Sequence, residues 1–189
     1  MEMLEEPRIT RHRLNVDQYR RMGEAGVLEP GVRVELIEGE VIDMAPIGSR
    51  HFSMVGRLTR LLVEATGAQA FVSVQQSLRL DRFNEPQPDV AVLQPRDDFY
   101  AEALPAGIDA LLVIEVAEST VAFDLLTKAR LYATHGVPVY WVIDLPAGLL
   151  HVHTEPQGDI YGSVVTLRSP GVMSIPGLAG VVIDLAGLL

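Results

Sequence analysis

The sequence predicts an α/β fold in which a mixed β-sheet is flanked by helices and carries extra β-hairpins. The segment 111–116 (LLVIEV) is apolar on both faces apart from one glutamate, as in a central strand that is covered on both sides. A helical pattern at 123–136 and a second buried segment at 137–145 follow it, and this strand–helix–strand order implies a right-handed parallel crossover. After Leu145, proline and glycine divide the chain into short alternating segments that are typical of antiparallel hairpins.

The first expected elements are a short helix and a hairpin. Residues 15–25 predict a helix with Asn15 as its N-cap, because a side-chain oxygen there can accept a backbone N–H of the first turn. Residues 32–46 alternate apolar and polar side chains on both sides of Glu38-Gly39. This pattern predicts a hairpin with glycine in its turn.

The middle of the chain predicts a long helix followed by two strands. From Ser49, apolar residues recur at helical spacing as far as Gly67, so we expect a helix with Ser49 as its cap. Segments 68–80 and 86–93 return to the strand pattern, and the second is entered through two prolines.

Length and composition limit the class of protein. The 189 residues suit one compact domain, so we expect a single domain over 1–189, with an N-terminal helical arm at 1–30 and a C-terminal β-hairpin extension at 146–189. Cysteine is absent, which excludes a disulfide framework, a thiolate zinc site and a cysteine nucleophile. The polar first residues do not resemble a signal peptide, and no apolar run approaches the roughly 20 residues of a membrane span. We therefore expect a cytoplasmic protein without a membrane segment.

The charge balance argues against a protein that coats nucleic acid. The chain carries 25 acidic and 15 basic residues, a net charge of −10, whereas affinity for phosphates comes mostly from lysine and arginine. An acidic excess fits plain solubility, or a cluster of carboxylates whose charge a bound cation offsets.

Glu115 is the informative acid, because a carboxylate inside an apolar strand loses its hydration unless something compensates. It could lie on an edge strand or pair with a cation such as Lys128. Alternatively, Glu115 and Asp89 together hold a divalent cation, since hard cations prefer oxygen ligands. Taken alone, Asp89 could simply be a turn acid after Pro88.

Lys128 lies on the helix that follows the Glu115 strand, and its long stem could bring the ammonium group over the same end of the sheet. The simpler interpretation is an ion pair with Asp124 one turn earlier, worth only about 0.3–0.5 kcal/mol. The two interpretations are compatible, because Asp124 could orient a functional Lys128.

These residues carry a family resemblance. Asp89 in a PDV segment, Glu115 at the end of an apolar strand and Lys128 on a helix resemble the PD-(D/E)XK nuclease superfamily. The stretch 111–144 resembles one branch of it closely, the Uma-two family of restriction-endonuclease-like proteins. The segment VELIEGEVIDMAP with the following His51, and the terminal IPGLAGVVIDLAGLL, fit the same family, so the resemblance covers most of the chain.

The resemblance implies a restriction endonuclease-like fold and an Mg²⁺-dependent endonuclease, with Mn²⁺ as a possible substitute. Asp89 and Glu115 match the metal-binding acids, with the Val116 carbonyl as a further ligand. Lys128 matches a catalytic lysine that has moved from the strand onto the following helix. Glu35 matches a family acid near the metal and is expected to act as a third ligand or through water.

The same resemblance implies a nucleic acid substrate, DNA above all. Ala117 stands where the plain superfamily pattern has lysine, so catalysis would depend on Lys128. His51, Arg50 and Arg57 are candidate substrate-binding residues, although a solvated helix surface explains them equally well. Exposed-looking apolar segments after Leu145 favour a homodimer.

Two other functions stay open at this stage. The chain could be a catalytically inactive module that keeps the nuclease fold for binding or regulation, since a fold alone does not guarantee an activity. It could also hydrolyse a small phosphorylated substrate, which the low content of basic residues would suit.

Overall fold

A mixed sheet forms the centre of the computed structural model, which describes residues 10–29 and 31–189. Its six strands lie in the order β3-β4-β5-β6-β7-β8. Only β5 and β6 pair in parallel, and every other neighbouring pair is antiparallel, so the predicted mixed sheet and its crossover are confirmed. The strands are β3 (Phe71–Val74), β4 (Val90–Leu93), β5 (Ala110–Ala117), β6 (Val139–Asp144), β7 (Leu149–Gln157) and β8 (Ile160–Leu167).

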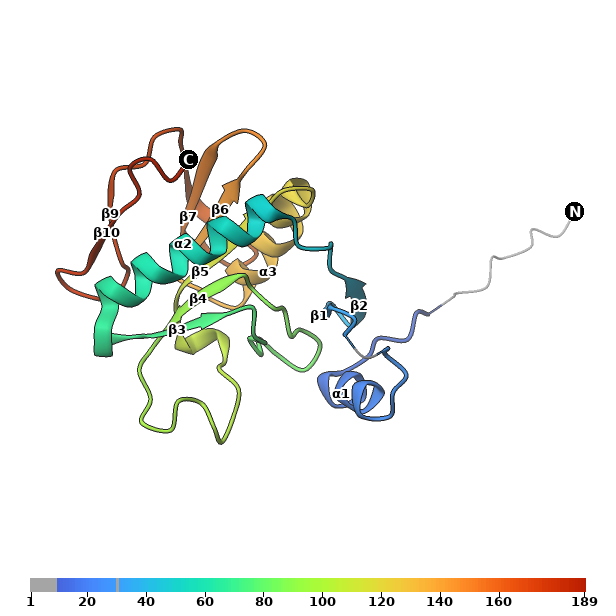
Figure 1. Cartoon of the computed structure of the whole chain (residues 1–189). Helices are drawn as coiled ribbons and strands as arrows, with labels where there is room; N and C mark the ends of the chain where they lie inside the picture. Colours follow the sequence, from blue (N-terminus) through green and yellow to red (C-terminus); the bar gives the residue numbers. More distant parts are fainter. Residues whose placement is uncertain (1–9, 30) are drawn as a thin grey trace, which may run out of the picture.

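Helices cover both faces of this sheet (Figure 1). The long helix α2 (Ser49–Thr66) packs on one face, against Val90, Val92 and Ile114 among others. The other face carries a π-helix (Phe123–Lys128) that continues directly into α3 (Ala129–Thr134). Two short 3₁₀ helices follow α2 and precede β5, at Gly67–Gln69 and Gly107–Asp109. In the described part of the chain, no helix combines the length and apolarity that crossing a membrane requires.

A smaller unit of α1 (Val16–Glu24), β1 (Val34–Ile37) and β2 (Glu40–Asp43) lies beside one end of the sheet (Figure 1). Asn15 caps α1 as predicted, by accepting the backbone N–H of Gln18. The β1–β2 turn has positive φ angles of 51° at Glu38 and 81° at Gly39, the conformation that suits a tight hairpin and favours glycine. Two backbone hydrogen bonds between Leu36 and Glu85 attach this hairpin to the rest of the molecule.

The C-terminal segments extend the architecture in two ways. Strands β7 and β8 continue the main sheet beyond β6. A separate antiparallel pair, β9 (Val172–Ser174) and β10 (Val182–Asp184), packs with the residues after it against the α2 side of the core. Residues 1–9 of the predicted N-terminal arm lie outside the described residues.

Two local predictions are wrong. Ser49 is the first residue of α2 and not its cap; the N-cap is Gly48, whose missing side chain makes no capping hydrogen bond. The strand predicted over 68–80 is limited to β3, because Gln75 adopts a left-handed φ of 51° that ends the extended chain. The helix predicted over 123–136 is confirmed, and its first part is a π-helix.

Candidate active site

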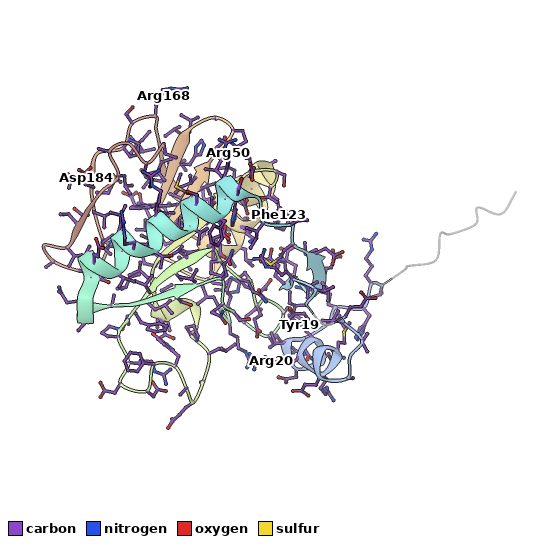
Figure 2. All side chains as sticks on the ribbon, viewed as in Figure 1. Tyr19, Arg20, Arg50, Phe123, Arg168 and Asp184 are labelled. Carbon is purple, nitrogen blue, oxygen red and sulfur yellow. The ribbon has the colours of Figure 1, made fainter. Side chains whose placement is uncertain are left out.

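A cavity of about 180 Å³ opens at one end of the sheet, and side chains from distant parts of the sequence line it. Five predicted residues meet there: Glu35 of β1, His51 of α2, Asp89 before β4, Glu115 of β5 and Lys128 of the π-helix. Figure 2 labels Phe123, which lines the same cavity from the π-helix.

The sheet register brings the two acids together. Val90 lies opposite Ile114 in the antiparallel β4–β5 pair, so the next step along each strand places Asp89 opposite Glu115. On the other side of β4, Val74 lies opposite Val90, and the same step places Gln75 opposite Asp89. Gln75, Asp89 and Glu115 therefore form a row across three strands.

Asp89 is held by a set of hydrogen-bond donors. Its Oδ2 atom accepts the Val116 backbone N–H at 2.9 Å and lies 3.0 Å from His51 Nε2, while Oδ1 accepts from Gln75 Nε2 at 3.2 Å. Burial alone would raise the pKa of Asp89, but the hydrogen bonds and the nearby His51 outweigh it and lower that pKa below its ordinary value. Asp89 is therefore a carboxylate at neutral pH.

Glu115 is buried on the sheet face that packs against α3. Its Oε1 atom accepts hydrogen bonds from Lys128 Nζ and from the Tyr132 hydroxyl, each at 3.0 Å. Complete burial raises the pKa of Glu115 well above its ordinary value, the Lys128 charge opposes this shift, and the neighbouring acids add to it. The structure thus shows the expected partner of Glu115, Lys128, and places a second acid, Asp89, directly before the neighbouring strand.

Lys128 is surrounded by carboxylates. Its Nζ atom lies 3.0 Å from Glu115 Oε1, 3.1 Å from Glu35 Oε2 and 3.9 Å from Asp124 Oδ1. Burial alone would lower the pKa of Lys128, but the three carboxylates raise it above its ordinary value, so the ammonium form persists. The same Oε2 atom of Glu35 also accepts the Gln87 backbone N–H at 3.2 Å, which helps to fix this side chain.

Asp124 is a further buried acid at this site. Its Oδ2 atom accepts the Thr120 hydroxyl at 2.6 Å. Burial raises the pKa of Asp124 to about 6, against the lowering effects of Lys128 and Thr120. The π-helix carries both Asp124 and Lys128 toward the cavity, in line with the frequent occurrence of π-turns at functional sites.

The charges leave this site with an excess of negative groups. Four buried carboxylates, Glu35, Asp89, Glu115 and Asp124, face one ammonium group and one histidine. Within the described residues, no group of three or more acids and histidines converges as a ready metal site. The oxygen donors and the excess charge nevertheless fit a hard divalent cation such as Mg²⁺, which accepts one or two carboxylates and keeps several waters.

The structure does not bring every predicted residue to this cavity. Arg50 Nη2 donates to the Leu145 carbonyl at 2.9 Å and Arg57 Nη2 to the Gly187 carbonyl at 3.0 Å. Both line a neighbouring hollow beside α2 instead, and Figure 2 labels Arg50 at the start of that helix. Val116 does line the cavity, and the contact it makes there is the N–H bond to Asp89.

Sequence reasoning missed two partners of the acids. Tyr132 lies four residues after Lys128, on the same helical face, and this spacing was a usable signal. Gln75 gave no such signal, because its contact with Asp89 depends on the register of β3 against β4.

Comparisons with known proteins bear on the fold and the family of the chain. None of the curated proteins matches the chain. A crystal structure described as "a putative nuclease belonging to DUF820" from Anabaena variabilis ATCC 29413 has a similar fold, with a TM-score of 0.63 and 16% sequence identity over 86% of this chain and 89% of that chain. The family model Uma2, described as "Putative restriction endonuclease", matches residues 16–186. Since that match spans most of the sequence, the chain belongs to the Uma2 family, as its motifs predicted.

Proposed function

We propose that this protein is an Mg²⁺-dependent endonuclease that hydrolyses phosphodiester bonds in DNA. The observation that carries the proposal is the meeting of Glu35, Asp89, Glu115 and Lys128 in one cavity, although 93 positions of sequence separate the first from the last. Membership of a family described as restriction endonucleases and a nuclease-like fold support a nuclease role.

Asp89 and Glu115 are the residues that would hold the metal, with the Val116 carbonyl as a further ligand and Glu35 as a third acid or a contact through water. A bound Mg²⁺, or Mn²⁺ in its place, polarises a phosphoryl oxygen and lowers the pKa of a coordinated water. His51 orients the Asp89 carboxylate through its 3.0 Å contact and faces the substrate side of the cavity.

Lys128 supplies the positive charge that phosphodiester hydrolysis requires. Its ammonium group lies within hydrogen-bond distance of Glu115 and Glu35, so it can neutralise charge that grows on the phosphate or hold the attacking water. Arg50 and Arg57, on the neighbouring hollow, would contact the nucleic acid backbone away from the bond that breaks.

Cleavage of supercoiled plasmid tests this function. We expect nicking with Mg²⁺ or Mn²⁺, complete inhibition by a chelator, and a loss of at least about 100-fold in Glu115→Gln and in Lys128→Met. Glu64→Gln is the matched control, because Glu64 is exposed on α2 and 68% of its side chain is accessible. Equal cleavage rates in the wild type and all three variants would refute the assignment.

A second candidate is a catalytically inactive module that binds nucleic acid or metal through the same fold. The pairing of Lys128 with Glu115 and Glu35 favours it, because an ammonium group that carboxylates already hold is less available to a phosphate. Calorimetry with Mn²⁺ separates the two functions. Binding that Asp89→Asn abolishes, in a protein that cleaves neither plasmid nor short duplexes, would identify the inactive module.

We also propose a cytoplasmic homodimer, since two copies would supply two active sites for two DNA strands. The outermost strand β8 supports it: it has no partner on one side among the described residues and exposes Ile160, Val164 and Val165. Light scattering of the wild type and of Val164→Lys gives the test. A monomeric wild type would refute the dimer.

A further inference from the structure

We propose that Arg33 binds a phosphate group of the nucleic acid backbone at the mouth of the cavity. This inference rests on the nuclease function proposed above and adds a residue that anchors the substrate. Arg33 directly precedes β1, and its side chain lines the same cavity as Asp89, Glu115 and Lys128.

The guanidinium group of Arg33 has an unsatisfied donor. Its Nη2 atom is buried, and no residue among 10–29 and 31–189 accepts a hydrogen bond from it. In residues 10–29 and 31–189, no ion pair includes Arg33. A buried, charged N–H donor that lacks an acceptor destabilises the protein. A ligand whose oxygen atoms accept a hydrogen bond from Nη2 would remove this cost, and the removal would add to the affinity for the ligand.

Other cations near the site already have carboxylate partners. Lys128 has three carboxylates around it, Arg20 pairs with Glu85 at 2.8 Å, and Arg130 pairs with Glu38 at 2.8 Å. Arg33 is therefore the strongly basic side chain lining the cavity that no carboxylate of the described chain holds.

The position of Arg33 suits a phosphate that approaches the acids. Arg33 and Glu35 are two residues apart at the start of a strand, so their side chains point to the same side of β1. The Met44 N–H donates to the Arg33 carbonyl at 2.9 Å, which fixes the backbone from which the long side chain extends into the cavity.

The chemistry favours a phosphate over other anions. An acidic cavity repels a polyanion, and a planar guanidinium group can offset this repulsion by donating two parallel hydrogen bonds to phosphate oxygens. Arg33 also lines a second hollow, with Tyr19, Arg20 and Gln87, so it lies where a polymer could pass from one hollow to the next. Figure 2 labels Tyr19 and Arg20 on that side of the molecule.

The test measures binding of a fluorescein-labelled DNA duplex of about 20 base pairs in Ca²⁺, at several salt concentrations. We expect Arg33→Met to bind at least about 10-fold more weakly, and its plot of log affinity against log salt to be shallower by about 0.9, the contribution of one phosphate contact. Arg33→Lys should keep the slope and lose part of the affinity. Arg168→Met, which removes an exposed arginine at the end of β8 (Figure 2), should change neither binding nor cleavage.

Two further measurements separate this inference from the proposed function. Calorimetry should show unchanged Mn²⁺ binding in Arg33→Met, and a thermal melt should show a folded protein with stability equal to or above that of the wild type. A wild type that cleaves DNA beside an Arg33→Met variant with unaltered affinity and salt slope would overturn the role of Arg33 alone. A wild type that neither binds nor cleaves the duplex would overturn both proposals.

Discussion

The two faces of the central sheet differ in chemistry. The α2 face buries aliphatic side chains from α2, from alternate residues of the strands and from the C-terminal segment, including Leu58, Leu62 and Ile114. The α3 face buries tyrosines and a histidine, and it continues into the cluster of Glu115, Asp124, Lys128 and their partners.

This difference separates stability from function. Burial of aliphatic groups on the α2 face is favourable at roughly 25 cal/mol per Å² of apolar surface removed from water. Burial of charged groups on the α3 face costs desolvation energy that ion pairs repay only in part. The α2 face therefore contributes stability without buried charge, whereas the α3 face combines an apolar core of its own with a costly charged cluster.

Beyond the charged cluster, the α3 face satisfies most of its polar groups. The Tyr140 hydroxyl donates to the Asp124 carbonyl at 3.0 Å and the Tyr161 hydroxyl to the Val137 carbonyl at 2.9 Å. Burial, aided by the nearby His151, lowers the pKa of His153 to about 4, so this histidine packs between the tyrosines as a neutral ring.

The largest effect on stability should come from removing the cation of the cluster. Lys128→Met leaves Glu35, Glu115 and Asp124 without their shared partner, and we expect it to lower the free energy of unfolding by about 3–5 kcal/mol at about pH 8. The loss should shrink at about pH 5, because acids with a raised pKa take up protons there. Urea unfolding of the wild type and of Lys128→Met at both pH values measures this loss of unfolding free energy.

Arg60→Met provides the matched control for this prediction. It removes a cation from an exposed, 4.0 Å pair with Glu64, so it should change the stability by less than about 1 kcal/mol at either pH. An equal loss in Lys128→Met at both pH values would show that packing and not charge holds the cluster together.

A smaller effect should follow from a cavity on the α2 face. Leu58 is fully buried, so we expect Leu58→Ala to lower the free energy of unfolding by about 3–4 kcal/mol at any pH, while cleavage by the folded protein stays unchanged. Leu126→Ala is the control, because Leu126 is 71% exposed on the π-helix and should cost less than about 0.5 kcal/mol. A Leu58→Ala variant that folds normally but has lost its activity would contradict this separation of the two faces.

The smallest of the three effects concerns pH. The pKa of Asp124 is raised in the folded state, so the folded protein binds this proton more tightly than the unfolded chain does. The stabilisation from this proton is complete below about pH 4 and is lost as the pH rises through about 6.

Comparison of wild type with Asp124→Asn isolates this contribution. Between about pH 4 and 7, the wild type should lose about 2–3 kcal/mol relative to the variant, whose amide does not titrate. Urea unfolding of both proteins across this pH range tests the sign of the pH dependence. A wild type that gains stability relative to Asp124→Asn as the pH rises would contradict the raised pKa.

Much of the architecture was readable from local patterns. The apolar run at 111–116 identified the central strand, and the turn at Gly39 was identified by the alternation on both sides of it. The residues that meet at the cavity were singled out because carboxylates are unusual inside apolar strands, and because their order along the chain resembles a family.

The rest depends on information that is not local. The row of Gln75, Asp89 and Glu115 depends on strand register, which pairs residues that are far apart along the chain. The pairing of Lys128 with Glu35 depends on how the β1–β2 hairpin docks beside the sheet. The π-helix could not be predicted from the sequence either, because the spacing of apolar residues over so few positions does not distinguish a π-turn from an α-turn.

The π-helix makes the position of the Lys128 side chain sensitive to the number of residues in this segment. Each residue advances a regular helix by about 100°, so deleting a single position between Ala122 and Asp124 would swing the lysine amine and everything after it about a quarter of a turn around the axis. Relatives that lack one residue here should have lost the pairing of the amine with the sheet, and with it the chemistry, while retaining a fold that looks unchanged.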